Sequence, residues 1–260
     1  MKYGKWTIVL AWCAVLALPA AAWADAAADY KQVSEELKKA PAQQNAALVE
    51  QMLTKLAGVP NELTPDQYKQ VRLWQAERTV QAKPDLDAPG KRAELNAERL
   101  KIVDDLTQHY LGTAVTDPIK RASVYKAQLD LALAVTDSQQ SQQAQARVAG
   151  AYLADMKERC LTVAEAAPAT KAAIITGLLR DAGRVKDAPA REAVYDQLIA
   201  LGSPESKVAY MDRAAYRLGK KLVAEGLADL KSVIDDEQCD AALRSLARTR
   251  RMQALVAGER

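Results

Sequence analysis

The chain has 260 residues, a formal net charge of +3 at pH 7 and no phenylalanine. This length suits one large domain, two small ones or an array of helices, and a charge so close to zero excludes a general electrostatic attraction to nucleic acid. Alanine, which costs least in a helix, fills 44 of the 236 residues after position 24, whereas strands favour branched and aromatic side chains. The composition therefore predicts an all-α fold.

The first 24 residues predict a secretory signal peptide. Lys2 and Lys5 precede an apolar run over residues 6–18, and Pro19 ends that run. Ala22-Trp23-Ala24 then supplies the small side chains of a cleavage site, so we expect cleavage near Ala24 and a mature chain in the periplasm or outside the cell. The alternative is an uncleaved anchor, but the run is shorter than the roughly 20 apolar residues of a membrane span. No later stretch reaches that length, and we expect no transmembrane segment in the mature chain.

Helix starts are marked by a side-chain oxygen beside a proline. Thr64-Pro65, Asp117-Pro118 and Ser203-Pro204 place an acceptor where the free amides of a first turn need one. Gly112, Gly202 and Gly226 follow apolar-periodic stretches, where a left-handed closing residue is cheapest as glycine. We expect helices over residues 27–39, 43–57, 64–82, 90–111, 117–136, 138–166, 169–182, 188–201, 204–225 and 227–257, the last with a break near Asp235-Asp236.

Apolar residues recur at helical spacing between these marks. Two of the stripes consist of Val148, Tyr152, Met156, Cys160 and Val163, and of Val208, Met211, Ala215, Leu218 and Leu222. Each stripe has to be buried, and the short links favour antiparallel neighbours. The segment 83–90, with Pro84, Pro89 and Gly90, is the best candidate for a linker. It separates an N-terminal helical region over residues 25–82 from a larger domain of helical hairpins over residues 91–260.

Cys160 and Cys239 are the cysteines that remain after cleavage. In an oxidising compartment an even number of cysteines favours a disulfide, and one that closes so long a loop adds about 4 kcal/mol if it is unstrained. The alternative is two buried thiols that act as small apolar side chains. No C-x-x-C pair or Cys/His cluster is present, so we expect no metal site and no haem or redox centre.

The segment from Ala215 to Gly219, followed by Gly226, has the small residue, the Leu-Gly pair and the closing glycine of the first helix of a tetratricopeptide repeat. A poorer copy runs from Ala173 to Gly177 with Gly183, and second helices follow at 193–199 and 228–234. Over roughly residues 169–240 the chain thus resembles tetratricopeptide-repeat proteins. The two copies lie 42 residues apart, whereas the family repeats every 34 or so residues. Residues 25–165 contain no copy.

This resemblance implies antiparallel helical hairpins stacked as an α-solenoid-like array, with a partner-binding surface on the first helix of each pair. Arg213, Arg217 and Lys220 are its implied surface positions, and their other interpretation is ordinary solvated charge. Without repeats, the same helices form a compact helical bundle. The cysteines distinguish the two folds, because the helices of Cys160 and Cys239 lie too far apart in an open array for a disulfide.

A possible basic patch lies near the C-terminus. It consists of Arg244, Arg248, Arg250 and Arg251, and it follows the acidic segment 235–240. Negative charge early and positive charge late in a helix both complement its dipole, so one interpretation is a well-charged terminal helix. The other is a contact surface for anionic lipid or an acidic partner.

Catalytic signatures are missing from the sequence. His109 is the only histidine, and its place near the end of a predicted helix favours a role in capping that helix over a role as a general base. The pairs Asp104-Asp105 and Asp235-Asp236 are helix neighbours that point about 100° apart, so neither pair converges on one substrate atom. No phosphate loop, H-E-x-x-H motif or calcium loop is present. We expect no enzyme, no cofactor and no bound metal.

The sequence as a whole favours an exported, non-enzymatic helical protein that serves as an interaction module or scaffold and holds another envelope protein. One alternative is a periplasmic holding chaperone, whose alanine-rich stripes form a shallow groove. Another is a hydrolase that cleaves an envelope polymer through an unpaired carboxylate. Nucleic acid is not expected among the partners.

Overall fold

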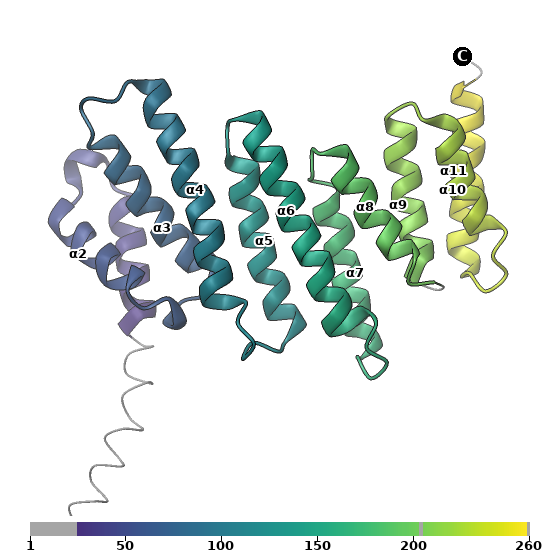
Figure 1. Ribbon diagram of the computed structural model, residues 1–260, viewed down its shortest axis with the longest axis horizontal. Helices are drawn as coiled ribbons and strands as arrows, with labels where there is room; N and C mark the ends of the chain where they lie inside the picture. The colour runs from purple at the N-terminus through teal and green to yellow at the C-terminus, as the bar shows by residue number, and fades with distance from the viewer. Residues whose placement is uncertain (1–24, 203–204, 259–260) are drawn as a thin grey trace, which may run out of the picture. The chain divides into compact units, whose positions relative to one another are not determined.

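A computed structural model describes residues 25–202 and 205–258, so the predicted signal peptide and Ser203-Pro204 lie outside the described residues. All regular elements in these ranges are helical, which confirms the all-α prediction (Figure 1). A first helix covers residues 25–37. The labelled helices are α2 (Ala46–Ala57), α3 (Pro65–Gln81), α4 (Ala88–Tyr110), α5 (Pro118–Ala134), α6 (Ser138–Met156), α7 (Pro168–Ala182), α8 (Ala188–Ile199), α9 (Glu205–Gly219), α10 (Val223–Ile234) and α11 (Ala241–Gly258). None of the described helices is both long and apolar enough to cross a membrane.

Two of the marked helix starts, at Thr64 and Asp117, are confirmed, and Asp187 caps a third helix. Thr64 forms a full capping box with Gln67, in which each side chain accepts a hydrogen bond from the other residue's backbone amide. Asp117 and Asp187 cap α5 and α8 in the simpler way, each accepting one amide of the first turn beside a proline. These caps fix where the helices of both halves of the chain begin.

The chain divides into two compact units, one ending at Thr113 and the other starting at Ala114. This boundary differs from the predicted linker over residues 83–90. That segment instead joins α3 to α4, which pack against each other inside the first unit. Proline and glycine there serve the turn and the start of α4, where the Asp87 carboxylate accepts the amide of Gly90.

The first unit encloses its own core. Large buried side chains from three helices meet in it, among them Leu53 of α2, Tyr68 of α3 and Leu106 of α4. Trp74 stacks on Tyr30 at 5.8 Å between ring centroids, which attaches the helix over residues 25–37 to α3.

The second unit consists of successive helices that pack on their neighbours in sequence. The helices α5 and α6, α7 and α8, and α9 and α10 form hairpins, and α11 packs on α10. The first helices of successive hairpins also touch, since α5 contacts α7 and α7 contacts α9. Because each hairpin reverses the chain, α5 and α7 run in the same direction (Figure 1). Their tetratricopeptide character remains a prediction.

The turn between α9 and α10 differs from the prediction of one helix over residues 204–225. The helix ends at Gly219, and Lys221 takes the left-handed conformation with φ 63°, while the Leu222 amide donates to the Arg217 carbonyl at 2.9 Å. This is the pattern of a helix that closes on a left-handed residue, a place that glycine fills at lower cost. Of the three predicted closing glycines, Gly202 has the expected conformation at φ 85°.

Gly226 has a different role from the predicted one. It lies inside α10, and a Cβ atom there would come within 2.7 Å of Leu218 Cγ and 3.3 Å of the Ala214 carbonyl oxygen. Glycine is therefore required by the close approach of α10 to α9. The sequence pattern correctly marked Gly226 as required, but the requirement is close helix packing and not a left-handed helix end.

The predicted apolar stripe of residues 208–222 is only partly confirmed. Met211 is buried and Leu218 packs against the same core, whereas Val208 is 47 % exposed and Leu222 lies outside the helix. The buried face of α9 also includes Ala209, Arg213 and Ala214. An arginine occupies a core position because carboxylates of two neighbouring helices neutralise it, an arrangement that a search for apolar periodicity does not detect. The stripe in α6 is confirmed, with its first four residues buried.

The two cysteines are free and buried in different environments. Cys160 lies in the π-helical turn Lys157–Leu161 after α6, whereas Cys239 belongs to a core cluster with Met211 of α9 and Leu230 of α10. Burial raises the pKa of both thiols, so each stays protonated and poorly reactive near neutral pH. The structure thus has the second of the two alternatives, a pair of apolar thiols.

Replacing Lys221 by glycine is expected to stabilise the protein by about 1 kcal/mol, because glycine adopts φ near 60° without the clash that a Cβ atom creates. Chemical denaturation with the helical signal as readout measures the difference. As a control, Gly202→Ala places a Cβ atom on a left-handed residue and is expected to destabilise the protein. Equal or reversed effects of the two changes would contradict the conformational argument.

Titration of the denatured, non-reduced protein with a thiol reagent is expected to detect the thiols of both Cys160 and Cys239. The reason is that the two sulfurs belong to separate packed regions and are not joined. Detection of neither thiol in a monomeric chain would show that the two regions meet and that the helices close on themselves.

Candidate binding groove

An open groove of about 530 Å³ lies between α5 and α7 in the second unit. We call it the α5–α7 groove. Its walls are the exposed Ile119 and the half-buried Ala122 of α5, which face the exposed Ala172 and Ala173 of α7. Small side chains on both helices keep the space between them open, whereas larger ones would fill it. Alanine, which the composition supplies in excess, thus creates a recess as well as a helix.

Tyr152 of α6 forms the floor of this groove. Its ring stacks on Tyr125 of α5 at 5.0 Å between centroids and 16° between planes, which fixes its position. Gly177 of α7 leaves room for its hydroxyl, since a Cβ atom there would come within 3.2 Å of that oxygen. Burial raises the pKa of Tyr152, and that of Tyr125 to about 12, so both hydroxyls remain protonated donors.

Tyr152 is only 4 % exposed, but it lines the groove, and its hydroxyl makes no hydrogen bond to the described residues. A donor in this situation is available to a bound group. Thr176 adds a hydroxyl from one wall of the groove. The Ser123 hydroxyl on the other wall donates to the Lys120 carbonyl at 2.6 Å and therefore offers an acceptor only. The groove therefore offers hydrogen bonds from three sides around an otherwise apolar recess.

The two ends of the groove differ in chemistry. Because α5 and α7 run in the same direction, the end near their starts holds Ile119 and Ala172, and the opposite end holds Lys126 and Arg180. Lys126 has no ion-pair partner in the described part of the chain. Arg180 forms an ion pair with Asp181, with 3.3 Å between Nε and Oδ1, and the Arg180 side chain is 60 % exposed. One end is thus apolar and the other positively charged.

The prediction that Arg213 lies on an exposed partner-binding surface is wrong. Its guanidinium makes two hydrogen bonds to Asp229 of α10, at 3.0 and 2.7 Å, and a third to Asp196 of α8. Arg217 donates to the same Asp229 at 3.0 Å and to Glu192 of α8 at 2.8 Å. We call this group the α8–α10 ion cluster.

Burial distinguishes this cluster from a surface patch. The Asp229 side chain is only 4 % exposed, and those of Arg213 and Arg217 are 10 % and 20 % exposed. The cluster fastens three helices together and leaves little of either guanidinium for a partner. Lys220, the third predicted position, is exposed in the turn after α9.

The possible basic patch lies along α11. Arg248 is exposed, and Arg244, Arg250 and Arg251 are half-buried. Among the described residues none of the four takes part in an ion pair, and the Nε atoms of Arg244 and Arg251 have no hydrogen-bond partner. The patch therefore keeps its positive charge.

A second hollow, of about 300 Å³, lies within the first unit between α2, α3 and α4 and contains three glutamates. Each of them has a cationic neighbour: Glu50 with Arg78, Glu94 with Lys83, and Glu98 with Lys101. Carboxylates compensated in this way are typical of helix-to-helix ion pairs. The described residues contain no cluster of three or more metal-ligating side chains.

Replacing Asp229 by alanine is expected to destabilise the protein by about 3–5 kcal/mol, because two arginines then lose their shared buried carboxylate. Urea denaturation measures the loss. Lys231→Ala on the same helix is the matched control: its pair with Asp235 is 61 % and 55 % exposed, and its removal should cost less than about 1 kcal/mol. A similar loss in the free energy of unfolding for both variants would show that the cluster does not stabilise the packing of these helices.

Comparison of the chain with known protein families, characterised proteins and solved structures found no match. Function must therefore be inferred from the side chains themselves. Within the second unit the α5–α7 groove combines an apolar end, side-chain hydroxyls and an accessible positive end. It is the strongest candidate for a binding site in the described part of the chain.

Proposed function

We propose that this protein is an exported, non-enzymatic interaction module that holds a short segment of a partner protein in the α5–α7 groove. The observation that carries the proposal is the asymmetry of this groove, with Ile119 at one end and Lys126 and Arg180 at the other. The first 24 residues support export, and the partner is then another protein of the cell envelope.

The shape of the groove favours a peptide over a compact small molecule. It is open to solvent, and its walls belong to two helices that run in the same direction, so an extended segment can lie along it. The small alanine side chains of its walls leave room for a side chain of the partner without rearrangement. The Tyr152 hydroxyl can donate a hydrogen bond to a backbone carbonyl of the bound segment.

Charge indicates the kind of segment that fits. Lys126 and Arg180 favour a carboxylate at one end of the bound segment, and Ile119 favours an apolar side chain at the other. We therefore expect the groove to select an apolar residue followed within a few positions by Asp, Glu or a chain terminus.

Selection from a displayed library of random peptides tests this function. Peptides recovered on the immobilised protein are expected to share the apolar-then-acidic pattern. Each should bind the double variant Lys126→Glu, Arg180→Glu about tenfold more weakly or worse, because two exposed ion pairs are replaced by repulsion. Titration calorimetry measures the affinities.

Two further variants separate the groove from general charge. Ala173→Trp fills the recess from an exposed position and is expected to abolish binding without loss of fold. Lys120→Glu changes the charge of an exposed residue of α5 outside the groove and should have little effect. Recovery of no peptide, or unchanged affinity for the filled variant, would refute the proposed function.

A further inference from the structure

One end of the second unit combines apolar and basic side chains that no described residue covers. It comprises the α9–α10 turn (residues 220–223) and the last turns of α11 (residues 248–256), and we call it the α11 tip. The two segments lie at the same end because α10 and α11 form a hairpin (Figure 1). At 1.5 Å per residue, the 18 residues of α11 extend about 9 Å further than the 12 residues of α10, so the last turns of α11 reach the level of the turn.

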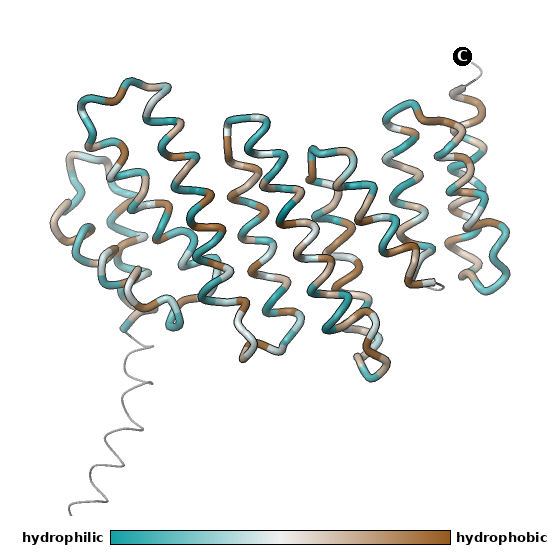
Figure 2. Tube along the Cα trace, in the orientation of Figure 1, coloured by the Kyte–Doolittle hydropathy of each residue, from teal (hydrophilic) through white to brown (hydrophobic). Residues whose placement is uncertain are grey.

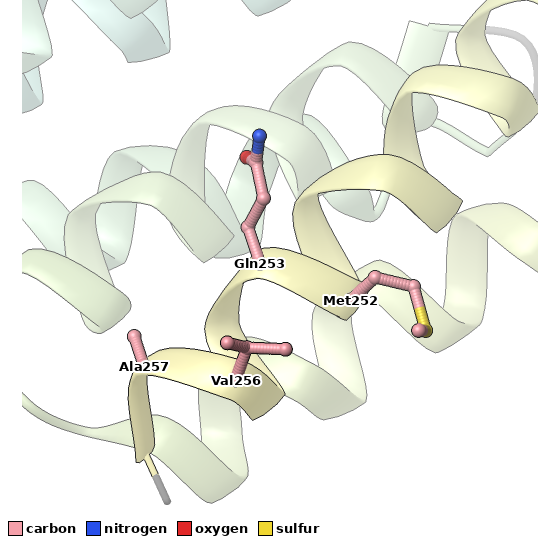
Figure 3. A pocket seen from close by; sticks show the side chains of 4 residues that line it. All are labelled: Met252, Gln253, Val256 and Ala257. Atoms are coloured by element: carbon pink, nitrogen blue, oxygen red, sulfur yellow. The ribbon is translucent and has the colours of Figure 1, made fainter. Parts of the chain in front are cut away.

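Large apolar side chains are exposed throughout this tip. Met252 is 63 % and Val256 is 52 % exposed, and Leu255, Leu222 and Val223 are also open to solvent. Met252 and Val256 border a shallow hollow of about 470 Å³ on α11 (Figure 3). The tube in Figure 2 shows hydrophobic residues in the last turns of α11. Five of the eight large exposed apolar side chains among the described residues thus belong to this one end.

The cations of the tip lack partners. Lys220, Lys221, Arg248 and Arg251 take part in no ion pair within the described ranges, and α11 itself contains no acidic residue. Glu225, in the first turn of α10, is the acidic residue closest to the turn in sequence. By contrast, Arg213 and Arg217 of α9 do have ion-pair partners, which are carboxylates of α8 and α10.

Lys221 adds an independent observation. It occupies the left-handed closing position of α9, where glycine would cost less. The lysine side chain at this strained position carries a positive charge next to the exposed Leu222. No ion pair among the described residues accounts for a lysine in this position.

We propose that the α11 tip docks on the surface of an anionic phospholipid bilayer. A helix that enters the headgroup region of a bilayer needs apolar side chains flanked by cations. The apolar side chains contact the acyl chains of the lipids, and the cations contact the phosphates. A fluid bilayer accepts an exposed end of a helical unit without a complementary shape. A second copy of the chain fits poorly, because it would bring the same unpaired cations face to face. Residues 1–24 fit poorly as well, since their own charges are Lys2 and Lys5.

Sedimentation with vesicles tests the proposal. The chain as isolated from the producing cells is mixed with vesicles of phosphatidylcholine alone or of equimolar phosphatidylcholine and phosphatidylglycerol. Every variant is compared with the same N-terminus, so that residues 1–24 contribute equally to all. Binding is expected only to the anionic vesicles, and it should weaken as salt shortens the range of the charges.

Lys221→Gly is the decisive variant. It is expected to fold more stably, yet to bind anionic vesicles about fivefold more weakly because one cation is lost from the contact. Lys120→Ala removes the same charge from the exposed side of α5 and should bind as the unchanged protein does. Leu255→Glu with Val256→Glu, both at exposed positions, is expected to weaken binding by more than about tenfold.

Several outcomes would overturn the proposal. They are equal binding to neutral and anionic vesicles, equal binding by Lys221→Gly and the unchanged chain, and vesicle binding that survives the double glutamate variant. A dimer in the absence of vesicles that the glutamate variant dissociates would assign the tip to a second copy. Ala173→Trp blocks the α5–α7 groove and should leave vesicle binding unchanged, so this test can fail independently of the proposed function.

Discussion

The carboxylate of Asp229 is the contact on which the arrangement of the last hairpins depends. It receives Arg213 through two hydrogen bonds and Arg217 through a third, and these arginines also reach Asp196 and Glu192 of α8. One buried acid thus sets the position of α10 against α9, and through the arginines against α8. Charged groups can replace apolar ones in this core because each is matched in place, whereas loss of one partner would leave the others desolvated.

The ion cluster also explains what could be predicted from the sequence and what could not. Local signals held, because Thr64, Asp117 and Asp187 cap the helices that they precede, and a cap depends on a few neighbouring residues only. The buried face of α9 was assigned only in part, because Arg213 resembles a surface residue until Asp229, sixteen positions later, is placed against it. Contacts of this kind depend on the tertiary fold and leave no periodic trace in one helix.

The candidate site was missed for a related reason. Ala122, Ala173 and Gly177 carry no chemistry, and they become walls only when α5 and α7 are side by side with Tyr152 between them. The sequence signal for the groove was the excess of alanine, which was interpreted as helix propensity and, in the chaperone alternative, as a shallow groove that was not assigned to particular helices. In a helical protein without phenylalanine, small residues decide where helices touch and where they leave a recess.

The distribution of charge matters more to recognition here than its sum. A net charge of +3 indicates no attraction to a polyanion, yet charges act over a Debye length of roughly 8–10 Å, which is smaller than either unit. Within that range the α8–α10 ion cluster is compensated, whereas Lys220, Lys221 and the arginines of α11 are not. None of the acids that balance them in the total belongs to α11. A nearly neutral chain can therefore present a strongly basic surface, provided that its remaining charges are neutralised internally.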